Sequence, residues 1–175
     1  YDKVQHHWKE EIKRLRGLVK KSTSDIEKAR FKKIVDFMRS VEMAVVISDS
    51  KADQERFEKA NLDIKPHIAR LEQLDKHGHD VEYNFKDPEH PLQIVFVCAM
   101  WLTGFDAPTV STLYLDKPMK GHTLMQTIAR ANRVASHKIK GYSGKFIEKK
   151  NGEIVDYYNV FRNMKEALKD YGQGD

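Results

Sequence analysis

Three short, mainly apolar runs limit the folds open to this chain, at residues 43–48, 92–98 and 111–115. A run in which apolar residues do not alternate with polar ones is typical of a strand covered on both faces. Segments predicted to be helical separate the runs, among them residues 51–60 and residues 64–77. Near the end of the chain we predict a turn at 149–152, a further strand at 154–157 and a closing helix at 160–171. Strands that alternate with helices predict an α/β fold with a mainly parallel sheet and helices on both faces.

Two amphipathic helices are predicted before the first strand. Their apolar residues recur at helical spacing: Trp8, Ile12, Leu15 and Val19, then Ile26, Phe31, Ile34, Val35 and Met38. Ser24, followed three residues later by Glu27, has the pattern of a capping box at the start of the second helix. We therefore divide the chain into a helical linker or appendage at 1–40 and a main α/β domain at 41–175.

Size and composition fit a globular domain with its own core, since the chain has 175 residues, of which 40% are hydrophobic and 33% charged. No apolar run approaches the roughly 18 residues that a membrane span needs, and the first residues have no signal-peptide character. The single cysteine, Cys98, excludes an internal disulfide and fits a reducing compartment. We expect a cytoplasmic protein with no membrane partner, and the first residue, Tyr1, suggests a fragment.

The net charge of +5 is unevenly distributed along the chain. Residues 1–40 hold 12 Lys and Arg against 6 Asp and Glu, and residues 120–150 hold 8 against 1. The second segment is where a polyphosphate or a DNA backbone could be bound. A solvated surface loop is the alternative for its lysines, which include Lys138, Lys140, Lys149 and Lys150.

A turn with the sequence TGFDAP, at residues 103–108, follows the second predicted strand. Open α/β sheets bind ligands at the carboxyl ends of their strands, where this turn would lie. Gly104 permits a close approach of the backbone to a ligand. Asp106 can accept a hydrogen bond from a ribose hydroxyl or orient an arginine, or it can cap local backbone amides instead.

A helix is predicted at residues 122–132, with Leu124, Ile128 and Ala131 on its inner side. Gln126, Arg130 and Arg133 follow at intervals of four and three residues, so they project from one face. Two guanidiniums on one face are suited to bind phosphate oxygens. The alternative is an ordinary surface helix with a basic stripe.

The order of this turn and this helix resembles motifs V and VI of a superfamily 2 helicase motor. Together with LDKPMKGH at 115–122 and LMQTIARANRV at 124–134, the chain resembles the restriction (R) subunit of type I restriction–modification enzymes. The resemblance implies a RecA-like (P-loop NTPase-type) fold for residues 41–175, the second of the two motor domains. It also implies that the chain is part of an ATP-dependent DNA translocase and site-specific deoxyribonuclease.

The resemblance also implies residue roles. Arg130 and Arg133 would be catalytic and reach the γ-phosphate across an interdomain cleft. Gln126 would contact the nucleotide or the attacking water, with Gly104 and Asp106 as further nucleotide-binding residues. DNA contacts are expected in the loops around the motifs, at Thr103, Lys117, Lys120 and His122. A salt bridge within the loop is an equally good explanation for the last three.

Other parts of such an enzyme are absent from this sequence. It has no Gly-x-x-x-x-Gly-Lys-[Ser/Thr] run, no Walker B acidic pair and no Asp…Glu-x-Lys nuclease arrangement. In the family these parts lie upstream, so ATP and Mg²⁺ would be bound mainly by a missing first motor domain, and the fragment alone would be inactive. The implied partners are double-stranded DNA and the methylation and specificity subunits. The histidines lack ligand spacing, and we predict no metal site.

Three other functions stay open at this stage, of which a stand-alone Rossmann-type small-molecule enzyme has no Gly-x-Gly-x-x-Gly run to support it. The chain could be the motor domain of a different superfamily 2 helicase, although the segment at 115–122 favours the restriction branch. It could also be a non-catalytic DNA-binding module that keeps the fold without the chemistry. The two arginines on one helical face argue against a passive module, because passive binding does not require that geometry.

Overall fold

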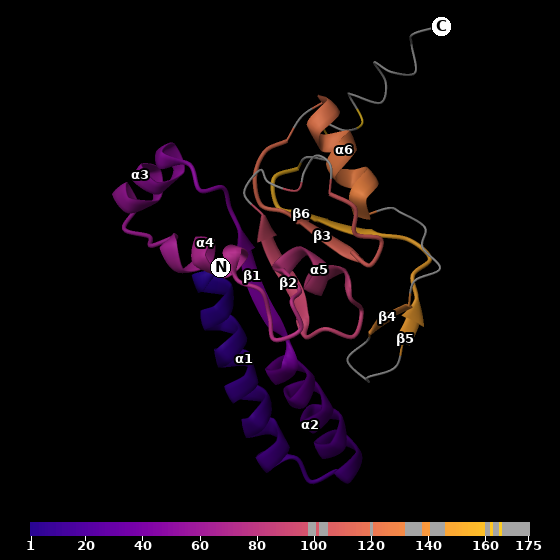
Figure 1. Cartoon of the computed structure of the whole chain (residues 1–175). Helices are drawn as coiled ribbons and strands as arrows, with labels where there is room; N and C mark the ends of the chain where they lie inside the picture. Colours follow the sequence, from indigo (N-terminus) through magenta and orange to yellow (C-terminus); the bar gives the residue numbers. More distant parts are fainter. Residues whose placement is uncertain are drawn as a thin grey trace, which may run out of the picture. The chain divides into compact units, whose positions relative to one another are not determined.

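The computed structural model in Figure 1 describes residues 1–97, 101, 105–119, 121–131, 138–140, 146–159, 162 and 165. They belong to two compact units. The first unit comprises Tyr1–Met100 and Lys140–Phe146, and the second comprises Trp101–Ile139 and Ile147–Asp175. The helix predicted at residues 160–171 lies almost wholly outside the described residues.

The two helices predicted at the start of the chain are confirmed as α1 (Asp2–Lys21) and α2 (Asp25–Ser40). They lie side by side as a hairpin, the darkest part of the chain in Figure 1. Leu15, Val35 and Met38 form the buried core between them. The Trp8 indole donates a hydrogen bond of 2.8 Å to the Met38 carbonyl, which ties the start of α1 to the end of α2. The helical spacing of apolar residues therefore predicted both helices and their shared core.

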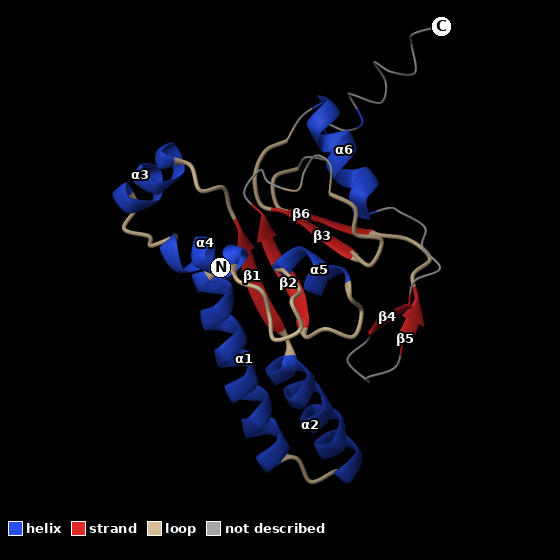
Figure 2. Cartoon of the chain, viewed as in Figure 1, coloured by secondary structure: helices blue, strands red, loops and turns tan. Residues whose placement is uncertain are grey.

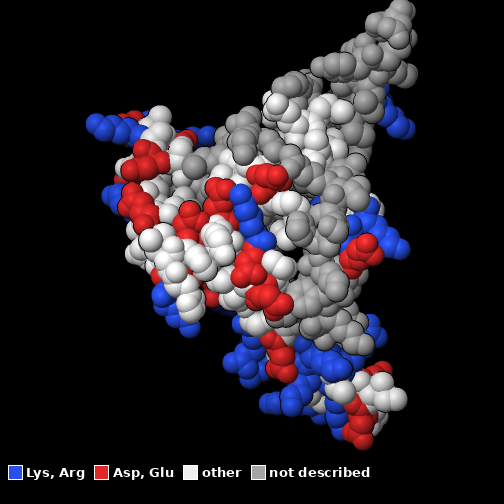
Figure 3. All heavy atoms as spheres, turned by 45° about the vertical axis from the view of Figure 1, so that its right-hand side comes forward, with Lys and Arg blue, Asp and Glu red and all other residues white. Residues whose placement is uncertain are grey.

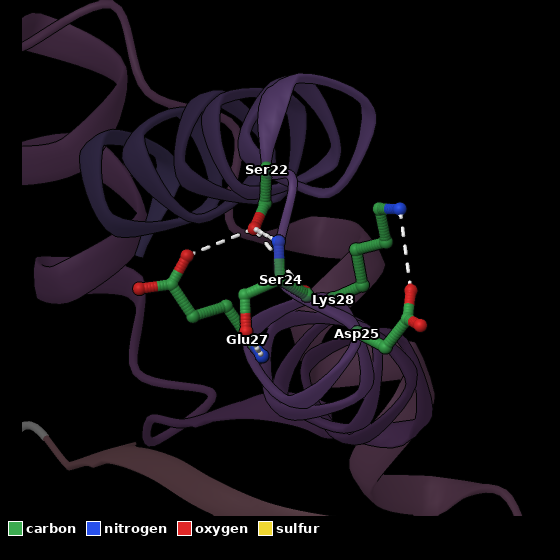
Figure 4. A network of polar contacts seen from close by, with 5 residues as sticks. All are labelled: Ser22, Ser24, Asp25, Glu27 and Lys28. Carbon is green, nitrogen blue, oxygen red and sulfur yellow. Dashed lines mark hydrogen bonds and ion pairs between the residues drawn. The ribbon is translucent and has the colours of Figure 1, made fainter.

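Polar contacts close the tip of this hairpin (Figure 4). Ser24 caps α2, because its hydroxyl accepts from the Glu27 amide at 3.4 Å. In a capping box the Glu27 carboxylate would accept from the Ser24 amide. Here Ser22 comes between them: its hydroxyl accepts from the Ser24 amide at 3.2 Å and donates to the Glu27 carboxylate at 2.8 Å. The cap is thus present, and its second half runs through Ser22.

The first unit also holds one pair of parallel strands, β1 (Glu42–Val46) and β2 (Leu92–Val97), seen side by side in Figure 2. Both strands and their parallel pairing agree with the sequence prediction. Three short helices connect them: α3 (Lys51–Lys59), α4 (Lys65–Glu72) and α5 (Val81–Lys86).

The connection between α4 and α5 differs from the prediction of one helix over residues 64–77. Asp75 folds the chain into a turn, since its carboxylate accepts from the backbone amides of His77 at 2.7 Å and His79 at 3.0 Å. The amides of His79 and His77 lower the pKa of Asp75 to about 2. Asp80 then caps α5 by accepting from the Tyr83 amide at 2.7 Å. These side-chain bonds to the backbone compete with continuation of the helix.

The second unit contains β3 (Thr112–Leu115), β6 (Glu153–Asp156) and α6 (Gly121–Ala131). β3 and β6 pair in parallel, as predicted for neighbouring strands of such a sheet. Two further short strands, β4 (Lys138–Lys140) and β5 (Phe146–Glu148), pair with each other and were not predicted. The fold is thus α/β, but the strands in the described part of the chain form only two-stranded sheets rather than one larger sheet.

Membrane insertion of a helix finds no support in the described residues. None of their helices combines the length and the apolar character that crossing a bilayer requires.

Candidate nucleotide- and DNA-coupling site

The turn around Asp106 is held by buried neighbours on both sides. Phe105 and Ala107 are buried, whereas Asp106 between them is exposed. The Trp101 ring stacks on the Phe105 ring, with centroids 4.1 Å apart and planes 5° from parallel. Trp101 has a φ of +64°, which is uncommon and strained for a residue other than glycine. The chain thus presents the Asp106 carboxylate on the surface of the second unit.

Lys149 is a buried cation that holds the same turn. Its side chain is 3% exposed, and its Nζ donates to the Pro108 carbonyl at 3.0 Å. Burial lowers the pKa of Lys149 below its usual value, because the charged ammonium loses hydration. The two roles considered for Lys149 from sequence, a phosphate contact or a solvated loop residue, are therefore both wrong. Lys150, the next residue, is exposed.

The inner face predicted for α6 is confirmed, and it packs against β3 and β6. Leu124 is buried with Leu115 and Met119, and Ile128 packs against this cluster. Ala131 is also buried. Thr127, another fully buried side chain, donates its hydroxyl to the Thr123 carbonyl at 2.7 Å, so its polar group is satisfied within the helix.

The positions of two proposed site residues lie on different parts of α6. With about 100° per residue, position 126 lies about 160° from position 124 and about 140° from position 131, on the far side of the helix from this core. Position 130 lies about 60° from position 127 and about 100° from position 131, at the side of the helix. Gln126 is half-buried, and Arg130 belongs to the last turn of the helix. The side chain of Arg130 and the whole of Arg133 lie outside the described residues, so their shared face with Gln126 stays a prediction.

The end of α6 is in close contact with the turn before β6. A Cβ added to Gly152 would lie 2.1 Å from the Ala131 carbonyl oxygen, closer than any side chain can approach. Only glycine therefore fits between the strand and the last helical turn. The sequence predicted a turn at residues 149–152, but the need for glycine comes from the helix 21 residues earlier in the chain.

The remaining predicted site residues are only partly placed. Lys117 is exposed in the loop that follows β3. His122 lies in the first turn of α6, although its side chain is not among those described. Thr103, Gly104 and Lys120 lie outside the described residues. Among the described residues, no group of three or more His, Cys, Asp or Glu side chains could hold a metal ion.

Comparison with known proteins decides the family. The family model described as type I restriction enzyme subunit R domain 3 matches residues 18–159. The chain belongs to this family. Over 129 residues, or 74% of its length, it is 40% identical to the putative type I restriction enzyme MjaIXP endonuclease subunit of Methanocaldococcus jannaschii. It is also 50% identical over 91 residues, or 52% of its length, to the type I restriction enzyme HindI endonuclease subunit of Haemophilus influenzae.

The matched region is a small part of these relatives. The chain corresponds to 10% of the length of the Methanocaldococcus protein and to 8% of the Haemophilus protein. Both relatives are described as endonuclease subunits of type I restriction enzymes.

Proposed function

We propose that this chain is the second RecA-like motor domain of a type I restriction enzyme R subunit, in which ATP hydrolysis drives DNA translocation. Membership of the family supports the R subunit. The resemblance of residues 103–108 and 124–134 to helicase motifs V and VI supports the motor domain. DNA cleavage would belong to another part of the same long polypeptide, as would the ATP-binding loop.

The observation that carries the proposal is the orientation of α6. Leu124, Thr127 and Ala131 are buried on one side of this helix. Position 126 is therefore directed away from that core, and position 130 lies at the side of the helix, which packing holds in place. In phosphoryl transfer the protein mainly positions the phosphates and neutralises their charge, which guanidiniums do well. Arg130 and Arg133 would act as arginine fingers on the γ-phosphate, with Gln126 beside them.

The Asp106 turn would couple this nucleotide site to DNA. Stacking of Trp101 on Phe105 and the bond from Lys149 to Pro108 hold the turn on both sides. Asp106 and Gly104 would face the nucleotide. The DNA side would be formed by Thr103, Lys117, Lys120 and His122.

The proposal assigns ATP and Mg²⁺ mainly to a first motor domain elsewhere in the intact subunit. Mg²⁺ would neutralise phosphate charge there, and this chain would add its arginines from across the cleft. Double-stranded DNA and the methylation and specificity subunits would be the partners of the whole enzyme.

DNA-stimulated ATP hydrolysis by the intact subunit that carries this chain tests the proposal. We expect Arg130→Ala and Arg133→Ala each to lower the turnover number by at least about a hundredfold, because an arginine finger raises turnover roughly 10³- to 10⁵-fold. DNA affinity should stay unchanged, and Arg130→Lys should recover only part of the turnover, because a lysine lacks the planar fork. The matched control is Arg162→Ala, which removes an exposed arginine of the same unit.

Unchanged turnover in both alanine variants would contradict the motor assignment. The arginines would then stabilise the carboxyl end of α6, where cations interact favourably with the helix dipole. Loss of DNA binding together with turnover would instead favour a passive DNA-binding module.

A further inference from the structure

A row of exposed cations runs along one side of α1. The four residues follow one another at intervals of four, three and four positions: Lys9, Lys13, Arg16 and Lys20. With 100° per residue they fall within an arc of about 60° on the helix. Within the described part of the chain, none of the four is in an ion pair with an acidic side chain. Their charges are therefore available to a partner.

α2 adds a second row on the same side of the hairpin, formed by Lys28, Lys32 and Arg39. Lys32 and Arg39 are exposed, whereas Lys28 is half-buried and is paired with Asp25 at 3.4 Å. This row lies about 70° from the direction of Val35 and Met38, which face α1. The α1 row lies about 110° around its helix from the side that carries Trp8, Ile12 and Leu15 and faces α2. The two helices run antiparallel. Both rows therefore project to one side, which we call the cationic face. Figure 3 shows Lys and Arg side chains gathered over this helical hairpin, in the lower part of the view.

The hairpin that carries the cationic face is held together at several points. Leu15, Val35 and Met38 pack between the helices, and the Trp8 indole bonds to the Met38 carbonyl. Ser22 and Ser24 close the tip. The backbone positions of the two rows are thus fixed relative to each other before any partner binds, which lowers the entropic cost of binding.

We propose that the cationic face binds the phosphate backbone of duplex DNA without reading its sequence. The α1 row is about 16 Å long, and the two rows are roughly 8 to 10 Å apart, the usual distance between packed helices. Duplex DNA carries one negative charge per about 1.7 Å of its axis, so several phosphates fall within this area. The choice of DNA among polyanions rests on the proposed function.

This contact would be separate from the proposed motor chemistry. The cationic face belongs to α1 and α2, whereas the proposed nucleotide site belongs to α6 and the Asp106 turn. The family model begins at residue 18, so Lys9, Lys13 and Arg16 precede the matched region. DNA bound by this face would be held by ionic contacts that do not depend on the nucleotide state.

The salt dependence of DNA binding by the 175-residue chain tests the proposal. Binding of a fluorescent duplex is followed by anisotropy over a series of salt concentrations. One variant replaces the α1 row with glutamine, a good helix former, at Lys9, Lys13, Arg16 and Lys20. A matched control removes the same charge from exposed residues on the other side of the hairpin, namely Lys3, Arg14, Lys21 and Arg30. Circular dichroism confirms that both variants keep their helices.

We expect the first variant to bind duplex DNA at least roughly tenfold more weakly. The magnitude of the slope of log affinity against log salt should fall by about 3 to 4, since each lost phosphate contact lowers that magnitude by about 0.9. The control should change the slope by less than about 1. Equal losses in both variants would mean that net charge alone attracts DNA, and no loss in either would mean that the face makes no DNA contact. Either result overturns the proposal, as does tighter binding to a single strand of the same length.

The outcome is independent of the Arg130 experiment. ATP hydrolysis at saturating DNA reports on the arginines of α6, whereas the salt slope in the absence of nucleotide reports on the hairpin. A failure of one proposal can therefore be told from a failure of the other.

Discussion

Replacement of Lys149 by methionine is the most informative test of how the Asp106 turn is held. The change keeps an apolar stem of similar length and removes the ammonium group that donates to the Pro108 carbonyl at 3.0 Å. An unsatisfied buried acceptor costs about 1–3 kcal/mol, and the relief of burying an ammonium offsets part of this cost. We expect Lys149→Met to lower the free energy of unfolding at pH 7 by about 1–2 kcal/mol.

The pH dependence gives this prediction a second signature. Burial lowers the pKa of Lys149 below its usual 10.5, so the unfolded chain keeps this proton at pH values where the folded chain has released it. Stability therefore rises with pH between the lowered folded pKa and 10.5, because the unfolded state binds more protons there. The Lys149→Met variant lacks this gain. The difference between wild type and variant should grow as the pH rises through that window.

Urea unfolding at a series of pH values measures both effects, with Lys150→Met as the matched control. Lys150 is the exposed neighbour, and its replacement should leave the unfolding free energy nearly unchanged at each pH. A Lys149→Met variant as stable as the wild type, with a parallel pH profile, would show that the bond to Pro108 does not hold the turn.

Two glycines give opposite predictions. Gly17→Ala should raise the free energy of unfolding by about 0.5–1 kcal/mol, because Gly17 lies inside α1 and an added Cβ meets nothing within 4 Å. Urea unfolding measures this change, and a loss of stability would contradict the prediction. Gly152→Ala should lower the free energy of unfolding by about 1–3 kcal/mol, because the new Cβ would lie 2.1 Å from the Ala131 carbonyl oxygen. A melting temperature equal to that of the wild type would show that the backbone can move aside without loss of stability.

Local patterns explain the parts of the fold that the sequence predicted. The apolar spacing of Leu15 and Met38 predicted the hairpin, and Leu124 with Ala131 predicted the inner face of α6. In each case the information lies within one or two helical turns. The missed break between α4 and α5 depends on Asp75, whose bonds to nearby amides win over a weak helical pattern.

Lys149 and Gly152 were beyond sequence reasoning for a different reason. A lysine next to another lysine and a glycine in a turn usually lie in a solvated loop. The burial of Lys149 depends on Pro108, 41 residues earlier, and the constraint on Gly152 depends on Ala131. Neither distant partner leaves a mark in the local pattern of residues.

These two distant contacts have one consequence for the proposed site. Lys149 touches the turn that presents Asp106, and Gly152 touches the last turn of α6, to which Arg130 belongs. The short segment 149–152 therefore contacts, through its first and last residues, both elements that the resemblance assigns to motifs V and VI. A displacement of the Asp106 turn would move the Pro108 carbonyl, and through Lys149 it would press the Gly152 backbone against α6. A tightly packed segment of this kind transmits small shifts instead of absorbing them. Under the proposed function this connection would couple the Asp106 turn to the helix of the proposed arginine fingers, and residues 149–152 lie in the same unit of the chain as both elements.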